Sequence, residues 1–185
     1  MIVYLRIGVL LEYYDLVSET CVFDDSLRMR LGFSKIGVLG RDVIAAGSNR
    51  SNVADFGNSV GFGGDIEQLL ALAQRGVKGI AITGSFIDRK LLTVMKENGC
   101  ILVLPLNAIT ASRGIVRTKN IYRMSKLYRS ATKLEIPVAF VSMAKTQLYM
   151  NSYMQLIELA NLVCADRSSA AHCISEVNKK LVMRI

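Results

Sequence analysis

Short, continuously apolar runs alternate with helix-like patterns along most of this chain. The runs at 79–83, 100–104 and 137–142 contain few polar positions and show no alternation between apolar and polar residues. Strands buried on both faces have this character, and they belong to parallel sheets covered by helices. We therefore expect strands at 13–17, 35–39, 59–62, 79–83, 100–104 and 137–142.

Helix-like stretches follow most of these runs and carry recognisable end signals. The first is predicted to begin at Asp24 or Asp25 and to end at Gly32, and the second is capped by Asp65 and closed by Gly76. Residues 40–58 are ambiguous. Helices are expected at 24–31, 65–74, 88–97 and 117–134, and near 152–163 and 168–181.

The order of these elements predicts the fold class. Strand–helix units joined by short connections imply a parallel α/β fold. About seven such units predict a β/α barrel-like fold, complete or incomplete, with about seven parallel strands. An open doubly wound sheet is the alternative. We expect one domain over residues 1–185, with residues 1–12 as an N-terminal extension.

Composition and charge narrow the class of protein. Hydrophobic residues make up 51% of the chain, which argues against disorder. Lysine and arginine number 23 against 15 acids, and the formal charge of +8 favours a polyanionic partner. The alternative is that this charge only keeps the protein soluble. No CxxC pair occurs, and the apolar opening is too short to span a bilayer. We expect a soluble, cytoplasmic protein with free thiols and no membrane partner.

Candidate catalytic groups are few. His172 is the one histidine, and the acids expected near strand ends are Asp15 and Asp88. Hydrolytic metal sites need several converging ligands, so we predict no metal site. A nucleophile needs a base beside it, and the pair that the pattern allows is Ser142 with Lys145. Because serines are common at strand ends, we expect no catalytic residue.

Glycines crowd the region before the helix at 65–74. A phosphate can sit at the N-terminus of a helix, but Asp65 at the cap position already satisfies the amides and adds negative charge. The sequence contains no P-loop pattern. A tight turn is therefore the preferred interpretation of Gly57, Gly61, Gly63 and Gly64.

The strongest signal is a basic helix. Between residues 111 and 145 there are eight lysines or arginines and one acid, Glu135. On a helical wheel Met124, Leu127, Tyr128, Ala131 and Leu134 share one arc; Lys119, Lys126, Arg129 and Lys133 lie opposite, with Arg123 at the margin. The apolar arc can pack on a sheet while the cations neutralise phosphates of a nucleic acid. A solvated helix face is the alternative.

Several motifs between Gly76 and Arg184 resemble one known family. They are GVKGIAI, CILVLPL, the basic helix, IPVAFVSMA and NSYMQLIELANLV, with weaker counterparts at 14–16 and 31–33. The chain resembles the archaeal ribonuclease P protein component 3 family, related to the 30-kilodalton subunit of the eukaryotic enzyme. Residues 41–58 do not match.

The resemblance implies a TIM/PHP-like barrel that acts as a noncatalytic protein subunit. In this family the RNA cleaves precursor tRNA at its 5′ end with Mg²⁺, and the protein binds that RNA and the small ferredoxin-like component 2. The protein itself holds no cofactor, and it is an indirect partner of precursor tRNA. The residues expected to contact RNA are Arg113, Arg117, Lys119, Lys126, Arg129, Lys133 and Lys145.

Three departures and two rival functions accompany this prediction. Asn107 and Asn151 stand where the family often has arginine, and Met143 replaces a small polar residue, so we place no RNA contact at the two asparagines. A PHP-type metal-dependent phosphoesterase is the enzyme alternative, but it needs histidines just after the first strand, where residues 14–18 contain none. A scaffold that binds only proteins is the second rival function.

Overall fold

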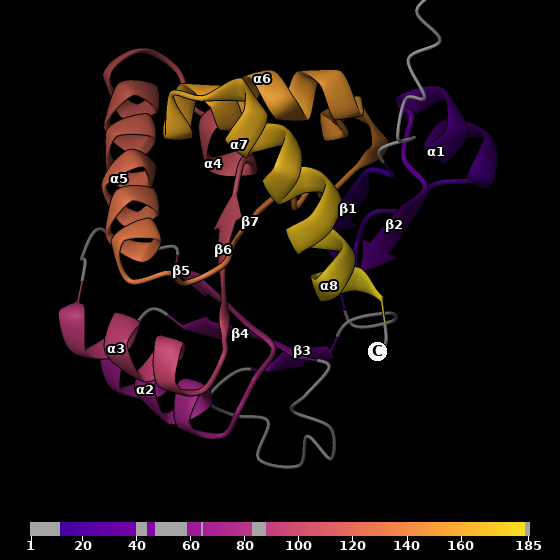
Figure 1. The fold of residues 1–185 in the computed structure, drawn as a ribbon. Helices are drawn as coiled ribbons and strands as arrows, with labels where there is room; N and C mark the ends of the chain where they lie inside the picture. The colour runs from indigo at the N-terminus through magenta and orange to yellow at the C-terminus, as the bar shows by residue number, and fades with distance from the viewer. Residues whose placement is uncertain (1–11, 40–43, 47–58, 64, 83–87, 184–185) are drawn as a thin grey trace, which may run out of the picture.

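Seven parallel strands form the centre of the protein (Figure 1). The computed structural model describes residues 12–39, 44–46, 59–63, 65–82 and 88–183. One sheet pairs β1 with β2, and the other has the order β3-β4-β5-β6-β7. The strands are β1 Tyr14–Val17, β2 Lys35–Val38, β3 Ile44–Ala46, β4 Ser59–Gly63, β5 Gly79–Ile82, β6 Ile101–Pro105 and β7 Val138–Val141.

Backbone hydrogen bonds connect β1 to the chain that leaves β7. The N–H of Met143 donates to the carbonyl of Leu16 at 2.9 Å, and the N–H of Ser18 donates to the carbonyl of Ala144 at 3.0 Å. The strands therefore follow the order β2-β1-β7-β6-β5-β4-β3. In the described part of the chain no pairing joins β2 to β3. The predicted parallel α/β fold is confirmed, whereas closure into a barrel is not shown.

The helices run between the strands as the sequence predicted, with differences at their ends. The predicted helix at 117–134 begins earlier, at Gly114, and the predicted helix at 168–181 is divided by a π-helical turn, η3. Two short elements, α4 and η2, were not predicted. The elements are α1 Asp25–Leu31, α2 Ile66–Gln74, α3 Arg89–Glu97, α4 Asn107–Thr110, α5 Gly114–Lys133, η2 Gln147–Tyr149, α6 Tyr153–Cys164, α7 Arg167–His172, η3 Cys173–Val177 and α8 Asn178–Val182.

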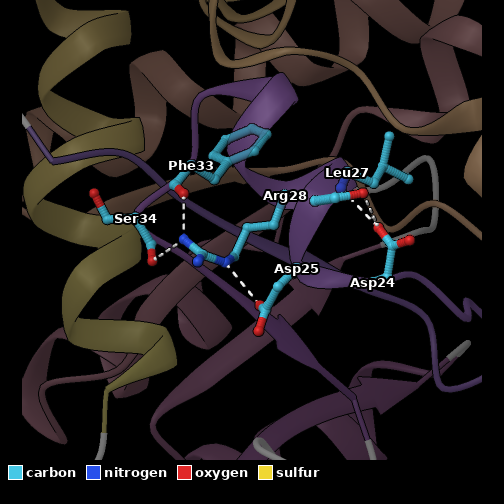
Figure 2. A network of polar contacts seen from close by, with 7 residues as sticks. Asp24, Asp25, Leu27, Arg28, Phe33 and Ser34 are labelled. Carbon is cyan, nitrogen blue, oxygen red and sulfur yellow. Dashed lines mark hydrogen bonds and ion pairs between the residues drawn. The ribbon is translucent and has the colours of Figure 1, made fainter.

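Polar contacts fix α1 between the first two strands (Figure 2). Asp24 is the N-cap and accepts the N–H of Leu27 at 2.7 Å, while Gly32 ends the helix at φ +81°. Arg28 pairs with Asp25 at 3.1 Å and donates to the carbonyls of Phe33 and Ser34 at 2.9 and 2.8 Å. This arginine therefore serves the fold, since it ties the end of α1 to the start of β2.

Each face of the strands contributes to a different hydrophobic core. Leu102, Leu104 and Phe140 point toward the layer of helices α2, α3, α5 and α6. Val103 and Val141 alternate with them and belong to the second core, which faces the opposite way. Burial on both faces explains why the strand sequences are continuously apolar.

The helix α8 covers the second core. The amide nitrogen of Asn178, which is fully buried, donates to the carbonyls of Tyr14 at 2.8 Å and Phe140 at 2.7 Å. Leu181 lies against β5 so closely that a Cβ built on Gly79 would be 3.0 Å from its Cδ1. Segments from both ends of the sequence are therefore packed into one core by this helix.

Two of the four glycines before α2 lie in a strand and not in the tight turn that we expected. Gly61 and Gly63 lie within β4, and a Cβ on them would approach Leu72 and Leu69 of α2 at 3.0 and 3.1 Å. Their absent side chains let α2 pack closely on the strand. Gly57 and Gly64 lie outside the described residues. Asp65 caps α2 as predicted, accepting the N–H of Glu67 at 3.1 Å.

Candidate nucleic-acid interface

The helix α5 stands along one side of the molecule (Figure 1) and is anchored by its apolar arc. Met124, Leu127 and Ala131 are buried, and Tyr128 stacks on Phe140 of β7 with ring centroids 5.8 Å apart. Ser125 donates to the carbonyl of Val163 in α6 at 2.8 Å. The predicted packing face of this helix is confirmed, and its opposite side is held outward by these contacts.

Four exposed cations occupy that outward side. We call Lys119, Lys126, Arg129 and Lys133 the cationic face. With Tyr122 they follow intervals of three and four residues, which place side chains on one side of a helix. In the described structure no member of the cationic face forms an ion pair, whereas Lys96 pairs with Glu135 at 3.2 Å and Arg167 with Glu158 at 3.0 Å. Its positive charge is therefore not neutralised by a carboxylate in salt-bridge contact.

The other predicted cations lie away from this face. Arg113 is the N-cap of α5 without a side-chain cap bond, and Lys145 is exposed in the segment after β7. Arg117 is also exposed, but it lines a groove toward α6. Arg123 borders a small pocket of about 80 Å³ between α5 and the ends of β5 and β6. The seven predicted RNA contacts thus divide between the cationic face and the edge near the carboxyl ends of the strands.

The groove beside Arg117 is open and partly apolar. It has a volume of about 640 Å³. Its walls come from α4, α5, α6 and the segment before α6, through Thr110, Arg117, Asn151, Met154, Gln155, Glu158, Leu159, Asn161 and Leu162. Two exposed large hydrophobic side chains, Met154 and Leu162, line it, and four more lie on α5 and η2: Ile115, Val116, Leu148 and Tyr149. Exposed apolar side chains beside a groove are typical of surfaces that contact another macromolecule.

A buried carboxylate lies between β1 and β7. Oδ1 of Asp15 accepts the N–H of Leu16 at 2.8 Å and the N–H of Ser142 at 2.7 Å. Its Oδ2 is also buried and has no hydrogen-bond partner among the residues that the structure describes. Burial raises the pKa of Asp15 to about 6, against the lowering effect of its hydrogen bonds to Ser142 and Leu16. This role was missed in the sequence, where an acid inside an apolar run was its one signal.

The remaining candidate catalytic residues either form hydrogen bonds to the backbone or are exposed on a helix. Asp88 caps α3 by accepting the N–H of Leu91 at 2.7 Å, and His172 is exposed at the end of α7. Ser142 is buried, and its Oγ accepts the N–H of Ala144 at 3.3 Å. Within the ranges that the structure describes, no group of three or more histidine, cysteine or acidic residues is arranged to hold a metal ion. None of the helices described there is long and apolar enough to cross a membrane.

At two of the positions that differ from the resembled family, the side chain forms a hydrogen bond to the backbone. Asn107 donates through Nδ2 to the carbonyl of Met143 at 3.2 Å, and Asn151 donates to the carbonyl of Tyr149 at 3.3 Å. Met143 itself has φ +47°, a left-handed conformation that is uncommon for a residue with a Cβ. The two asparagines therefore stabilise the chain around the strand ends.

Comparison with solved structures finds the same fold elsewhere. One chain of the cryo-EM structure of archaeal ribonuclease P with mature tRNA matches with a TM-score of 0.65, at 16% identity over 93% of this chain and 84% of that chain. The crystal structure of an uncharacterized protein matches with a TM-score of 0.54, at 12% identity over 91% and 55% of the two chains. A Xaa-Pro dipeptidase with bound methionine matches at 0.50, with 18% identity over 67% and 33%.

These three structural matches are similarities of fold. No protein-family model matches the chain, and no curated protein matches its sequence. The chain accordingly shares a parallel α/β architecture with a chain of archaeal ribonuclease P and with proteins outside that assembly.

Proposed function

We propose that this protein is a noncatalytic subunit of ribonuclease P that binds the catalytic RNA and supports 5′ maturation of precursor tRNA. The observation that carries the proposal is an exposed cationic face that forms no ion pair with a carboxylate of the described residues, on a fold that matches a chain of archaeal ribonuclease P over 93% of this chain. The sequence motifs that resemble component 3 point to the same role.

The cationic face would act on the RNA backbone. Lysine and arginine that neutralise phosphates release counterions, which gives affinity that falls steeply with salt and carries little sequence information. Lys119, Lys126, Arg129 and Lys133 lie on one side of α5, so one RNA segment can meet all four. Arg113, Arg117 and Lys145 extend the positive field toward the strand ends.

In this proposal the RNA performs the cleavage with its own Mg²⁺, and the protein contributes no reacting group. The second partner is the small ferredoxin-like component 2. The exposed hydrophobic residues around the α5–α6 groove support a protein contact, because such side chains are better covered by a protein than by an RNA backbone.

A pull-down of the tagged full chain from native lysate, followed by RNA sequencing, tests the proposal. We expect enrichment of ribonuclease P RNA over other RNAs of similar length. Addition of the protein and its partner to that RNA should also raise the rate of precursor tRNA cleavage. Recovery of a protein partner without RNA, even at low salt, would favour the scaffold alternative.

The isolated chain should be assayed for the rival enzyme activity. Metal analysis and a phosphoesterase assay of the purified protein separate the two functions. Tightly bound stoichiometric metal together with turnover of a phosphate ester would contradict the noncatalytic role.

A further inference from the structure

Tyr122 lies among the members of the cationic face and is exposed to 60% of its full area. It follows Lys119 by three residues and precedes Lys126 and Arg129 by four and seven. At a rise of about 1.5 Å per residue, all three cations lie within about 11 Å of it along the axis of α5. Lysine and arginine side chains are long enough to contact phosphate groups of a ligand beside the ring.

Most tyrosines in the described chain are used by the fold. Tyr13 stacks on Tyr153 with centroids 4.4 Å apart, and the hydroxyl of Tyr14 donates to Glu12 at 2.6 Å. Tyr128 stacks on Phe140, as described above. Tyr122 has a different contact, because the Nζ of Lys126 lies 4.8 Å from its ring centroid. A single ammonium group can cover one face of the ring, and the large exposed area leaves ring surface open to a ligand.

A surface that holds phosphates alone has no need of an aromatic ring. Aromatic side chains within a positively charged groove or stripe are typical of single-strand binding, where a base stacks on the ring and cations hold the flanking phosphates. In a continuous RNA duplex the bases are stacked inside the helix, so an aromatic ring on a protein surface cannot reach their faces. A protein partner is disfavoured here because the ring is surrounded by cations that form no ion pair with any carboxylate in the described ranges.

We propose that Tyr122 is a stacking platform for an unpaired RNA base, with Lys119, Lys126 and Arg129 on the adjacent phosphates. The α5 surface would then prefer a single-stranded loop, bulge or end to a continuous duplex. This inference rests on the proposed function, since it specifies which RNA structure the cationic face binds.

Affinity measurements on the full chain test the platform. The probes are a fluorescent unstructured 12-nucleotide RNA and a blunt duplex that contains the same strand, each titrated over a series of KCl concentrations. Loss of one base–aromatic stack weakens binding by roughly 5- to 150-fold. We expect Tyr122→Ala to weaken single-strand binding by this factor, to leave duplex binding unchanged, and to keep the salt dependence of the wild type, because stacking releases no counterion.

Two variants serve as controls for the affinity measurement. Tyr122→Phe keeps the ring and should bind the single strand within about threefold of the wild type, because stacking uses the ring and not the hydroxyl. Met29 is a matched exposed side chain, at 64%, on α1 outside the cationic face. We expect Met29→Ala to bind both RNAs like the wild type.

A spectroscopic readout is available because the chain contains no tryptophan. Tyr122→Trp would place a single indole within the cationic face. We expect its fluorescence to be quenched by the single strand and to change little with the duplex or with heparin, which is a polyanion without bases. Met29→Trp, on α1, should respond to none of the three.

The results separate this inference from the proposed function. If the wild type binds RNA and Lys126→Ala lowers the salt dependence, but Tyr122→Ala and Tyr122→Leu bind the single strand like the wild type, the stacking platform is wrong and RNA binding stands. If the wild type binds neither RNA at low salt, the proposed function fails first. Equal affinity of Tyr122→Leu and Tyr122→Phe would overturn stacking in favour of a simple apolar contact.

Discussion

The side chain of Asp15 and the backbone N–H of Ser142 form a 2.7 Å hydrogen bond between residues 127 positions apart. It joins the first described strand to the end of the last one. The same oxygen accepts the N–H of Leu16, while Oδ2 has no hydrogen-bond partner within the described part of the chain. An ionised carboxylate is costly in such a place, since burial removes its water and one oxygen gains no replacement.

The stability of the protein should therefore depend on the protonation of Asp15. Its pKa rises from 3.8 to about 6 on folding. A raised carboxyl pKa means that the native state binds the proton more tightly, so this contribution is fully present below pH 3.8 and is lost as the pH rises through about 6. The difference corresponds to about 3 kcal/mol.

Asp15→Asn isolates that effect. The amide keeps an oxygen for the two N–H groups and cannot ionise, so we expect the variant to be more stable than the wild type at pH 7.5, with the advantage shrinking at pH 4.5. Urea unfolding at the two pH values measures it. Parallel pH profiles for the two proteins would show that Asp15 does not titrate between these values.

Asn178 gives a second prediction, because its buried amide satisfies the carbonyls of Tyr14 and Phe140. Asn178→Asp should lower the free energy of unfolding by about 3–5 kcal/mol at pH 7, since a carboxylate would face two carbonyl oxygens. The loss should be smaller at pH 4, where a protonated acid can donate one bond. Lys180→Ala, an exposed change on the same helix, should remain within about 0.5 kcal/mol of the wild type.

The packing of α8 on β5 predicts a steric coupling between Gly79 and Leu181. A Cβ at Gly79 would lie 2.9 Å from Cγ2 of Val103 and 3.0 Å from Cδ1 of Leu181. We expect Gly79→Ala to destabilise the protein by about 1–3 kcal/mol. Because Leu181→Ala makes room, the double variant should lose less than the sum of the single losses, by at least about 0.5 kcal/mol. Strict additivity in guanidinium unfolding would contradict this packing.

RNA affinity should respond to each cation of the cationic face through its salt dependence. Lys126→Ala and Arg129→Ala should each reduce the slope of log K against log salt by about one, because each removes one phosphate contact. Lys90→Ala on α3 is the control, an exposed lysine on another helix, and its slope should equal that of the wild type. Equal slopes for all four proteins would remove the cationic face from RNA binding.

Much of the fold follows from local sequence signals. The continuously apolar runs predicted β5, β6 and β7 to within one or two residues, because burial on both faces leaves no polar position. Asp24 and Gly32 set the ends of α1 through a side-chain cap and a left-handed turn, both of which are local. The apolar arc of α5 was likewise predicted, because its spacing is a property of the helix itself.

Features that depend on distant residues were not predicted. Gly61 and Gly63 resemble turn residues until Leu72 and Leu69 of α2 are placed against them. β3 contains three residues, too few for a periodic pattern, and its pairing with β4 defines it. The importance of Asp15 depends on a backbone N–H far along the sequence.

The candidate site was predicted in part. The exposure of all seven cations and the opposition of charged and apolar sides of α5 were expected, whereas the direction of Arg117 toward α6 was not. A wheel places Arg117 near the apolar arc, but it does not show that the first turns of α5 extend past β7 and meet α6. The significance of Tyr122 emerged from its exposure beside Lys126, which the sequence does not give.

None of the four cations on the outward side of α5 helps to bury the helix, which is held by Met124, Leu127 and Ala131. Charge there is consequently decoupled from folding, and its sign or density can change at little cost to the scaffold. Substitutions on this side of α5 can therefore change the surface charge of the protein while the core that positions the helix stays as it is.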